Sequence, residues 1–240
     1  MSETLFNIVR SNDRVSPTAA LYVEVIADFV CPFSFLGKRR LDEALKAVAG
    51  PVNVGWYPFQ LNPEIPPEGQ AFDDYLTRRF GSRDAIDPVL EELTREGERQ
   101  GIRFAFDRIQ HVPNTLPAHQ VMQHAETLGK DQTELAEALM VAFFEDGRDI
   151  GERDVLTEVA ARVGMRGRDV RTAIGSDQVR QVVVAREAQV RSSGLNAAPG
   201  VLLNRRLLVV GAQPTEAIVN AFDRAMFGEG MDELVSPALH

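Results

Sequence analysis

Residues 27–45 of the chain read ADFVCPFSFLGKRRLDEAL and contain Cys31, the only cysteine in the sequence. The stretch runs out of an apolar strand, through a Cys-Pro pair, into a pattern typical of a helix. Pro32 suits the first helical position, because the N–H that proline lacks would have no partner there. We therefore expect Cys31 at the N-cap of a helix, with its sulfur facing unpaired backbone N–H groups.

This position predicts a reactive thiol. The thiolate is the reactive form of cysteine, and the N–H groups and macrodipole at a helix start lower its pKa. Ser34 lies one turn further along, so its hydroxyl or backbone N–H can reach the sulfur. A small buried apolar residue is the competing interpretation of Cys31. We expect instead that Cys31 and Ser34 are the catalytic residues.

Ser34 also decides which thiol chemistry is open to the chain. In a dithiol oxidoreductase, the residue three after the attacking cysteine is a second cysteine, which releases the mixed disulfide by internal attack. A serine cannot do this. Cys31 can form a mixed disulfide, but a separate thiol such as glutathione must then resolve it. We therefore expect glutathione as a co-substrate and no bound cofactor.

The sequence on either side predicts an α/β fold. Residues 21–29 and 52–59 read as strands on either side of a helix over 32–49, and together they form a β-α-β unit. From residue 71 to about 192 the periodicity is almost wholly helical. One helix of this block is predicted over 116–128, with Asn114 and Thr115 as its capping residues.

Strand patterns return near the C-terminus. They cover residues 200–204 and 206–211 and meet at a tight turn, and a last helix is predicted from Pro214 to Gly228. The order is β-α-β, helical block, β-β-α. With a cysteine at the first helix start and a proline before the third strand, this is a thioredoxin-like layout.

The layout divides the chain into three expected parts. The first is a flexible N-terminal arm, the second a thioredoxin-like domain made from two segments, and the third an all-helical insertion between those segments. Their respective boundaries are residues 1–19, residues 20–66 with 193–240, and residues 67–192.

A second informative stretch, SSGLNAAPGVLLN, covers residues 192–204. A proline directly before a strand is compatible with a cis peptide bond, although trans is the commoner state. If Ala198-Pro199 were cis and beside Cys31, the backbone of Ala198 would be free to pair with an extended substrate. We place substrate binding at Ala198 and Pro199, together with Pro32 and Phe33 of the helix start. An ordinary trans loop proline is the alternative.

Composition limits the class of partner. The chain has 240 residues, 44% apolar and 25% charged, with a net charge of −9. This balance argues against nucleic acid or an anionic membrane, because both need a positive surface. No apolar run is long enough to span a bilayer, and no export signal precedes the first strand. With a single cysteine, a reducing compartment and hence the cytoplasm are expected.

Other polar residues are weaker signals. His111, His119 and His124 lack an acidic or cysteine neighbour that would complete a ligand set, so we predict no metal site. The basic run at residues 38–40 is interpreted as a solvated face, and attraction of an anionic substrate such as glutathione is the alternative. The sequence leaves open whether the chain forms a homodimer.

Four stretches taken together resemble the DsbA-type thioredoxin-fold family, and specifically its cytoplasmic FrnE-like branch. They are VEVIADFVCPFSFLGKRRLDEAL (23–45), NTLPAHQVMQHAETLGK (114–130), ALMVAFFEDGRDIGERDVL (138–156) and AAPGVLLNRRLLVVGAQP (197–214). The resemblance implies a thioredoxin fold interrupted by an all-helical domain. It also implies that Cys31 is the first motif cysteine and Pro199 the cis-proline.

The resemblance is incomplete at the motif itself. The FrnE-like branch usually has Cys-Pro-Trp-Cys, whereas this chain has Cys31-Pro32-Phe33-Ser34. The related 2-hydroxychromene-2-carboxylate isomerases and kappa-class glutathione transferases carry serine at the first motif position and use glutathione. This chain retains the cysteine that those enzymes lack, so its motif lies between the two groups.

Three hypotheses of function follow. The first is a thiol-disulfide oxidoreductase or disulfide isomerase that works through Cys31 alone and is coupled to glutathione. The second is a glutathione-dependent isomerase or transferase acting on a small molecule, in which Ser34 steadies the glutathione thiolate. The third is a non-catalytic thioredoxin-fold protein that binds a partner.

Overall fold

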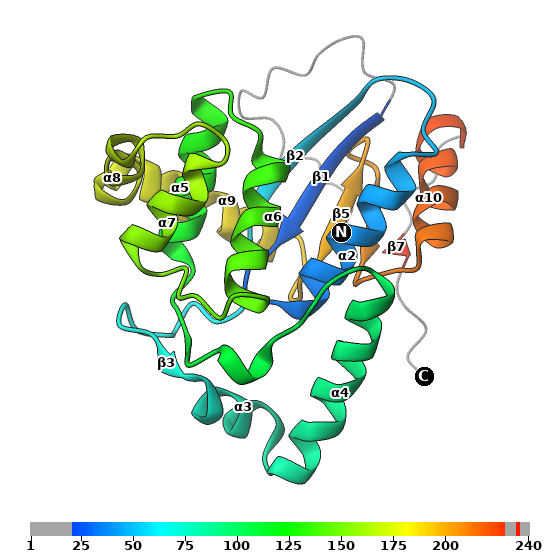
Figure 1. The fold of residues 1–240 in the computed structure, drawn as a ribbon. Coiled ribbons are helices and arrows are strands. Elements are labelled where there is room, and N and C mark those ends of the chain that lie inside the picture. The colour runs from blue at the N-terminus through cyan, green and yellow to red at the C-terminus, as the bar shows by residue number, and fades with distance from the viewer. Residues whose placement is uncertain (1–20, 229–233, 236–240) are drawn as a thin grey trace. The chain divides into compact units, whose positions relative to one another are not determined.

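The computed structural model describes residues 21–228 and 234–235, so the predicted flexible arm at 1–19 lies outside the described residues. The helices and strands are shown in Figure 1. In chain order they are β1 Leu21–Ala27, α2 Pro32–Leu45, β2 Val52–Pro58, β3 Gln70–Ala71, α3 Phe72–Phe80, α4 Arg83–Arg99, the 3₁₀ turn η1 Phe106–Arg108, β4 His111–Val112, α5 Leu116–Thr127, α6 Gln132–Phe144, α7 Arg153–Ala161, α8 Gly167–Gly175, α9 Asp177–Ser192, β5 Gly200–Leu203, β6 Leu207–Val210, α10 Thr215–Phe227 and β7 Leu234–Val235.

The chain forms two compact units. The first consists of residues 1–59 and 184–240, and the second of residues 60–183. The boundaries fall earlier than the expected residues 66 and 192. On the C-terminal side the reason is α9, a single helix that continues through the boundary, so its second half belongs to the first unit. Each unit is described separately below.

The first unit is built on a five-stranded sheet in the order β2-β1-β5-β6-β7. The interior strand β1 is almost fully buried, as its run of apolar residues predicts. It pairs parallel with β2 and antiparallel with β5, with Ala27 opposite Pro58 and Ile26 opposite Gly200. The ends of β1 and β2 and the start of β5 therefore meet at one edge of the sheet.

Helices α2 and α10 pack against each other, and α10 also contacts β1, β5 and β6. The helix α2 ends at Leu45, earlier than the predicted residue 49. The N–H groups of Ala47 and Val48 bond to carbonyls three residues back, so the last turn tightens and leaves the α-helix. Gly50, at φ 139°, then turns the chain toward β2.

The predicted tight turn between β5 and β6 is confirmed. Asn204 and Arg205 have φ values of 47° and 59°, the left-handed conformation that a two-residue hairpin turn requires. The Asn204 side chain accepts from the Tyr22 N–H at 2.8 Å and donates to the Ala225 carbonyl at 2.9 Å. One side chain thus ties the hairpin to β1 and α10.

The second unit is mostly helical. Its helix α5 packs on α6, α7 and α8, and the buried Gln120 side chain donates to the carbonyls of Ala173 and Ile174 at the end of α8. The predicted cap of α5 is half right. Asn114 Oδ1 accepts from the Leu116 N–H at 3.0 Å, whereas the side chain of the N-cap residue Thr115 makes no capping bond.

A short antiparallel strand pair interrupts the helical block. Gln70 and Ala71 pair with Val112 and His111. Two residues are too few to produce a strand periodicity, so the sequence pattern contained no sign of them.

In the described part of the chain, the helices all fall short of the length and apolar character that crossing a membrane requires.

We predict that residue 97 of α4 must be glycine, because the neighbouring Phe104 ring leaves no room for a larger side chain. A Cβ at Gly97 would lie 2.5 Å from the Phe104 ring, which is 8% exposed and packs edge-on against Phe144. In an exposed helix Gly→Ala stabilises by about 1 kcal/mol. Here we expect Gly97→Ala to lower the free energy of unfolding by about 1–3 kcal/mol, because the ring must shift. Urea unfolding measures the change.

Gly175→Ala is the matched control. No atom lies within 4 Å of a Cβ built at Gly175, the last residue of α8. This substitution should leave stability unchanged or raise it by up to about 1 kcal/mol. Equal stability of the two variants would contradict the predicted clash at Phe104.

Candidate active site

Cys31 is the N-cap of α2, as predicted. Its backbone is extended, with φ −95° and ψ 114°, and Pro32 takes the first helical position. The Cys31 carbonyl accepts from the Ser34 N–H at 3.0 Å, and the Cys31 N–H donates to the Asp28 carbonyl at 3.3 Å. The turn at residues 28–30 thus leads directly from β1 into the helix.

The loop before β5 lies against this helix start. The Ala198-Pro199 peptide bond is cis, and the Cys31 thiol donates to the Ala198 carbonyl across 3.6 Å. The two residues are 167 positions apart in the sequence. Pairing of β1 with both β2 and β5 brings them together, because it places the end of β1 beside the start of β5.

Two residues that sequence reasoning missed as site residues hold this loop in place. A Cβ at Gly37 would lie 3.0 Å from Pro199 Cγ, so glycine allows α2 to approach the proline closely. Arg40 donates to the Ala212 carbonyl at 2.5 Å, and the Gly211 N–H donates to the Pro199 carbonyl at 2.8 Å. A glycine inside a helical pattern is a signal of such close packing.

Ser34 and Asp28 lie beneath the helix start. They are 2% and 0% exposed, respectively. Ser34 Oγ accepts from the Asp28 N–H at 3.4 Å, and Asp28 Oδ1 accepts from the Phe29 N–H at 2.8 Å. Asp28 was not among the predicted site residues. An acidic residue at the end of a buried strand, three positions before the cysteine, was the available signal.

The expectation of a lowered pKa at Cys31 is wrong. Cys31 is 2% exposed, and this burial raises the pKa of its thiol above the ordinary cysteine value. The Ser34 hydroxyl and the N–H groups of Ser34 and Phe33 lower the pKa, while the Asp28 carboxyl raises it. These donors at the start of α2 favour the thiolate, but burial has the larger effect on the pKa.

The other predicted binding residues differ in exposure. Pro32 is half-buried, whereas Phe33 is 49% exposed and presents an apolar ring next to the motif. Phe33 and the backbone of Ala198 thus frame the sulfur from the helix and from the loop.

The basic run does not form a solvated face. Lys38 is 5% exposed and pairs with Asp42 at 2.6 Å, and Arg40 is bound to the Ala212 carbonyl. The Arg39 guanidinium lies 5.3 Å from the centre of the Phe35 ring. The three charged side chains therefore have partners within the first unit. The interpretation of this run as a solvated face is wrong.

The histidines do not form a cluster. Within the described residues, no group of three histidine, cysteine or acidic side chains is arranged to hold a metal ion. His119 is 3% exposed in α5, whereas His111 is exposed in β4.

The raised pKa predicts how alkylation of Cys31 depends on pH. Only the thiolate reacts, so the rate with iodoacetamide should rise with a midpoint above the value of about 8.5 for a free cysteine. Asp28→Asn removes a charge that disfavours the thiolate and should shift the midpoint to lower pH. Ser34→Ala removes a donor that favours the thiolate and should shift it to higher pH. Stopped-time alkylation followed by intact mass measures each midpoint.

Cys31→Ala is the control for this series, because it must show no alkylation under any condition. A midpoint below that of free cysteine would contradict the dominance of burial. Shifts of equal sign in the Asp28 and Ser34 variants would contradict the opposite roles assigned to these two neighbours.

The chain is similar to several proteins of known sequence or structure. The chain is 30% identical to the uncharacterized protein YwbO of Bacillus subtilis over 154 residues, 64% of this chain and 72% of that protein. A probable DsbA oxidoreductase from Streptomyces coelicolor is 26% identical, with a TM-score of 0.80 over 88% of this chain and 92% of that one. The cytosolic disulfide reductase DsbM from Pseudomonas aeruginosa, solved with GSH, has the same fold at 18% identity, with a TM-score of 0.57 over 85% and 95%.

The family comparison agrees with the fold. The model of the DSBA-like thioredoxin domain matches residues 22–223, which include β1, α2 and the loop at Pro199 as well as the whole second unit. The thioredoxin-like fold that the sequence predicted is thereby confirmed. The chain belongs to the DSBA-like thioredoxin domain family and is an enzyme of the oxidoreductase or isomerase kind that this family comprises.

Proposed function

We propose that the protein is a cytoplasmic thiol-disulfide oxidoreductase that works through Cys31 alone and is coupled to glutathione. One observation carries the proposal. The sulfur of the single cysteine lies at the start of α2 and 3.6 Å from the carbonyl of the residue before cis-Pro199. Family membership supports disulfide chemistry, and the glutathione-bound disulfide reductase DsbM supports glutathione as the partner thiol.

The proposed cycle balances without a second cysteine. The Cys31 thiolate attacks one sulfur of a substrate disulfide, which breaks the S–S bond, and the leaving thiolate takes up a proton. A glutathione thiolate then attacks the substrate sulfur of the mixed disulfide and releases Cys31. A second glutathione reduces the resulting substrate–glutathione disulfide and yields oxidised glutathione. Ser34 takes no covalent part.

Ala198 has a defined role in this cycle. Its carbonyl accepts the Cys31 S–H in the reduced protein. A disulfide sulfur has no proton, so formation of the mixed disulfide frees this carbonyl. An extended substrate can then donate a backbone N–H to it, in the manner of strand addition. Exposed Phe33 supplies apolar contact for the same substrate.

The raised pKa favours the reductive direction. A strongly oxidising disulfide arises where the reduced thiolate is stabilised, as in DsbA itself. Here burial destabilises the Cys31 thiolate. Reduction of a disulfide at Cys31 would release this unfavourable thiolate, so the disulfide has little tendency to oxidise other thiols. We therefore propose that the enzyme reduces or isomerises disulfides and is a weak oxidant.

A glutathione adduct tests the cycle. After incubation of reduced protein with oxidised glutathione, we expect intact mass to show one added glutathione, faster at higher pH, and complete removal by excess reduced glutathione. In Ser34→Cys the new thiol stands three residues after Cys31, where it can attack the adduct. That variant should therefore lose glutathione without added thiol and end as an internal disulfide.

Cys31→Ala must show no adduct, and Ser34→Ala should keep the wild-type need for external thiol. Release of glutathione from the wild-type adduct without added thiol would contradict the single-cysteine cycle. If wild-type Cys31 forms no adduct even at alkaline pH, the thiol is inert and the proposal fails.

Burial of Cys31 favours a second candidate, a glutathione-dependent isomerase or transferase acting on a small molecule. The raised pKa keeps Cys31 protonated, so it is a poor nucleophile at neutral pH. In this reading the Ser34 hydroxyl and the N–H groups of Ser34 and Phe33 steady the thiolate of glutathione, and Cys31 takes no covalent part.

Glutathione binding separates the two candidates. If the second is correct, calorimetry should give the same Kd for reduced glutathione with wild-type protein and Cys31→Ala, and about tenfold weaker binding with Ser34→Ala, from one lost hydrogen bond to a charged group. Turnover of a 2-hydroxychromene-2-carboxylate substrate should likewise persist in Cys31→Ala. Loss of turnover in that variant would return the assignment to the thiol cycle.

A further inference from the structure

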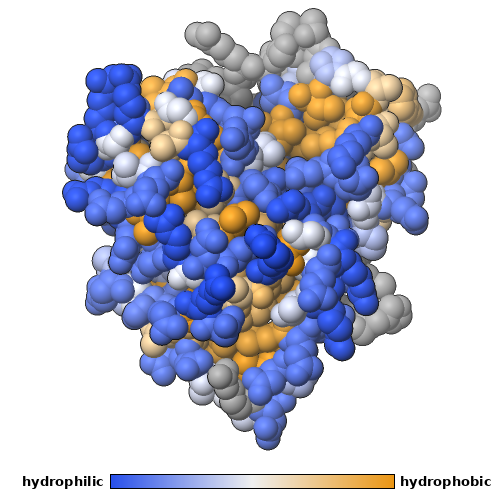
Figure 2. Space-filling model, viewed as in Figure 1, coloured by the Kyte–Doolittle hydropathy of each residue, from blue (hydrophilic) through white to orange (hydrophobic). Residues whose placement is uncertain are grey.

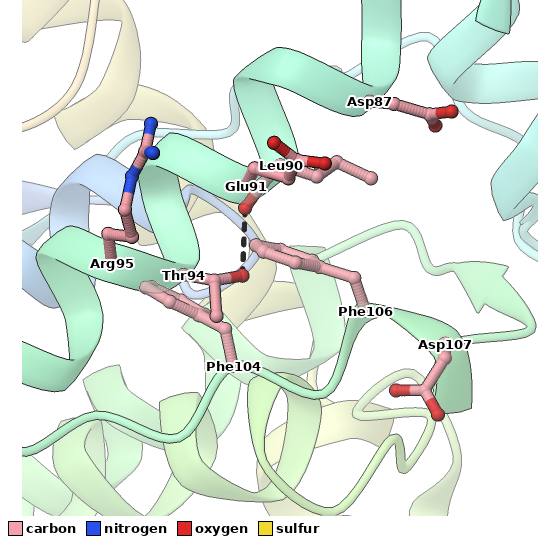
Figure 3. Close-up of a pocket in the computed structure, with 8 residues that line it drawn as sticks. All are labelled: Asp87, Leu90, Glu91, Thr94, Arg95, Phe104, Phe106 and Asp107. Atoms are coloured by element: carbon pink, nitrogen blue, oxygen red, sulfur yellow. Dashed lines mark hydrogen bonds between the residues drawn. The ribbon is translucent and has the colours of Figure 1, made fainter.

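Helix α4 of the second unit has one buried side and one side that is largely exposed. One is buried within the unit through Ile86, Leu93 and Gly97. The other is a stripe with spacings of three and four residues, which lies along one side of a helix. Together with Phe104, Phe106 and Asp107, this stripe lines a hollow of about 590 Å³ (Figure 3). Its members are Asp87, Leu90, Glu91, Thr94 and Arg95.

A second hollow of about 510 Å³ continues the first toward α3. Asp87, Leu90, Phe106 and Asp107 line both hollows. We call the residues that line either hollow the α4 groove. Figure 2 shows apolar surface framed by hydrophilic side chains in the lower part of the molecule, where Figure 1 shows α3 and α4. The groove is open and elongated, unlike the enclosed cavities that hold small organic ligands.

The floor of the groove is aromatic and fixed. The rings of Phe104 and Phe106 stack 5.0 Å apart with an angle of 10° between their planes. Phe104 is in turn packed edge-on against Phe144, at 5.2 Å and 88°. Phe106 and Leu90 are half-buried, so each offers apolar surface to a side chain from outside. Such a floor is preorganised for one aliphatic or aromatic anchor.

The rim of the groove is acidic. Asp73, Asp87, Glu91 and Asp107 line it and are all exposed. Arg95 is the only cation among the described residues that line the hollows, and it pairs with Glu92. In Figure 3 the Arg95 side chain lies at the end of the hollow away from Asp87 and Asp107. The rim therefore presents negative charge around an apolar floor.

We propose that the α4 groove binds a short basic segment of a partner protein, with an apolar side chain against Leu90 and Phe106 and lysine or arginine side chains opposite Asp87, Glu91 and Asp107. Charge complementarity selects this occupant, because the exposed carboxylates of Glu91 and Asp107 beside an aromatic floor suit cations that also contact ring faces. The net charge of −9 adds long-range attraction. The proposal does not depend on the chemistry of Cys31.

Fluorescence anisotropy with a labelled peptide tests the groove. The probe is an eight-residue peptide in which lysine alternates with leucine and phenylalanine, and the comparison peptide has glutamate in place of lysine. We expect the full-length protein to bind the basic peptide only, with affinity that falls as salt rises. The triple variant Asp87→Asn, Glu91→Gln, Asp107→Asn should bind about tenfold more weakly, since each exposed ion pair contributes modestly.

The charge-matched control is Glu98→Gln, Asp154→Asn, Asp177→Asn, which removes three exposed carboxylates of the second unit that do not line the groove. It should change the Kd less than twofold. Phe106→Ala should weaken binding severalfold, because the anchor loses its contact, and Cys31→Ala should bind as wild type. Circular dichroism verifies that each variant is folded.

Several outcomes would overturn the proposal. Equal weakening in the two triple variants would mean that the peptide responds only to net charge. Unchanged binding in both the groove triple variant and Phe106→Ala would exclude the groove as the site. Absence of binding to wild-type protein would exclude a basic segment as its occupant. Self-association that the groove triple variant abolishes would assign the surface to a second copy of the chain instead.

Discussion

The close approach between the start of α2 and the loop before β5 is the contact on which the site depends. It needs the antiparallel pairing of β1 with β5, because this pairing places the start of β5 beside the end of β1, from which the chain enters α2. Gly37 makes this approach easier, since a Cβ there would lie 3.0 Å from Pro199 Cγ. The same contact covers the sulfur of Cys31 and leaves it 2% exposed.

That cover changes the chemistry expected of a thiol at a helix start. Unpaired N–H groups at a helix start stabilise a thiolate, but here the thiol is buried and donates to the Ala198 carbonyl. Burial beside Asp28 then outweighs the donors at Ser34 and Phe33. The raised pKa therefore favours the protonated thiol form of Cys31.

The local features of this site could be predicted from the sequence, whereas the features that depend on distant residues could not. The Cys-Pro pair after an apolar strand identifies the N-cap, and the turn at Asn204 and Arg205 identifies the hairpin, because each depends on neighbouring residues only. The pKa of Cys31 depends above all on how deeply the folded chain buries the thiol, which no periodicity reports. Asn114, and not Thr115, supplies the capping side chain of α5, and its amide also donates to the Ile65 carbonyl, 49 positions away.

The two units use different physics to recognise a partner. Around Cys31 the exposed features are one aromatic ring and a backbone carbonyl, while the nearby basic side chains are engaged within the unit. Recognition there should therefore depend little on the charge of the substrate. The α4 groove joins four carboxylates to an apolar floor and thus discriminates by charge. A net charge of −9 disfavours binding of polyanions such as nucleic acid and favours binding of basic protein segments. The excess of acidic residues that argues against nucleic acid thus also supports a basic partner for the α4 groove.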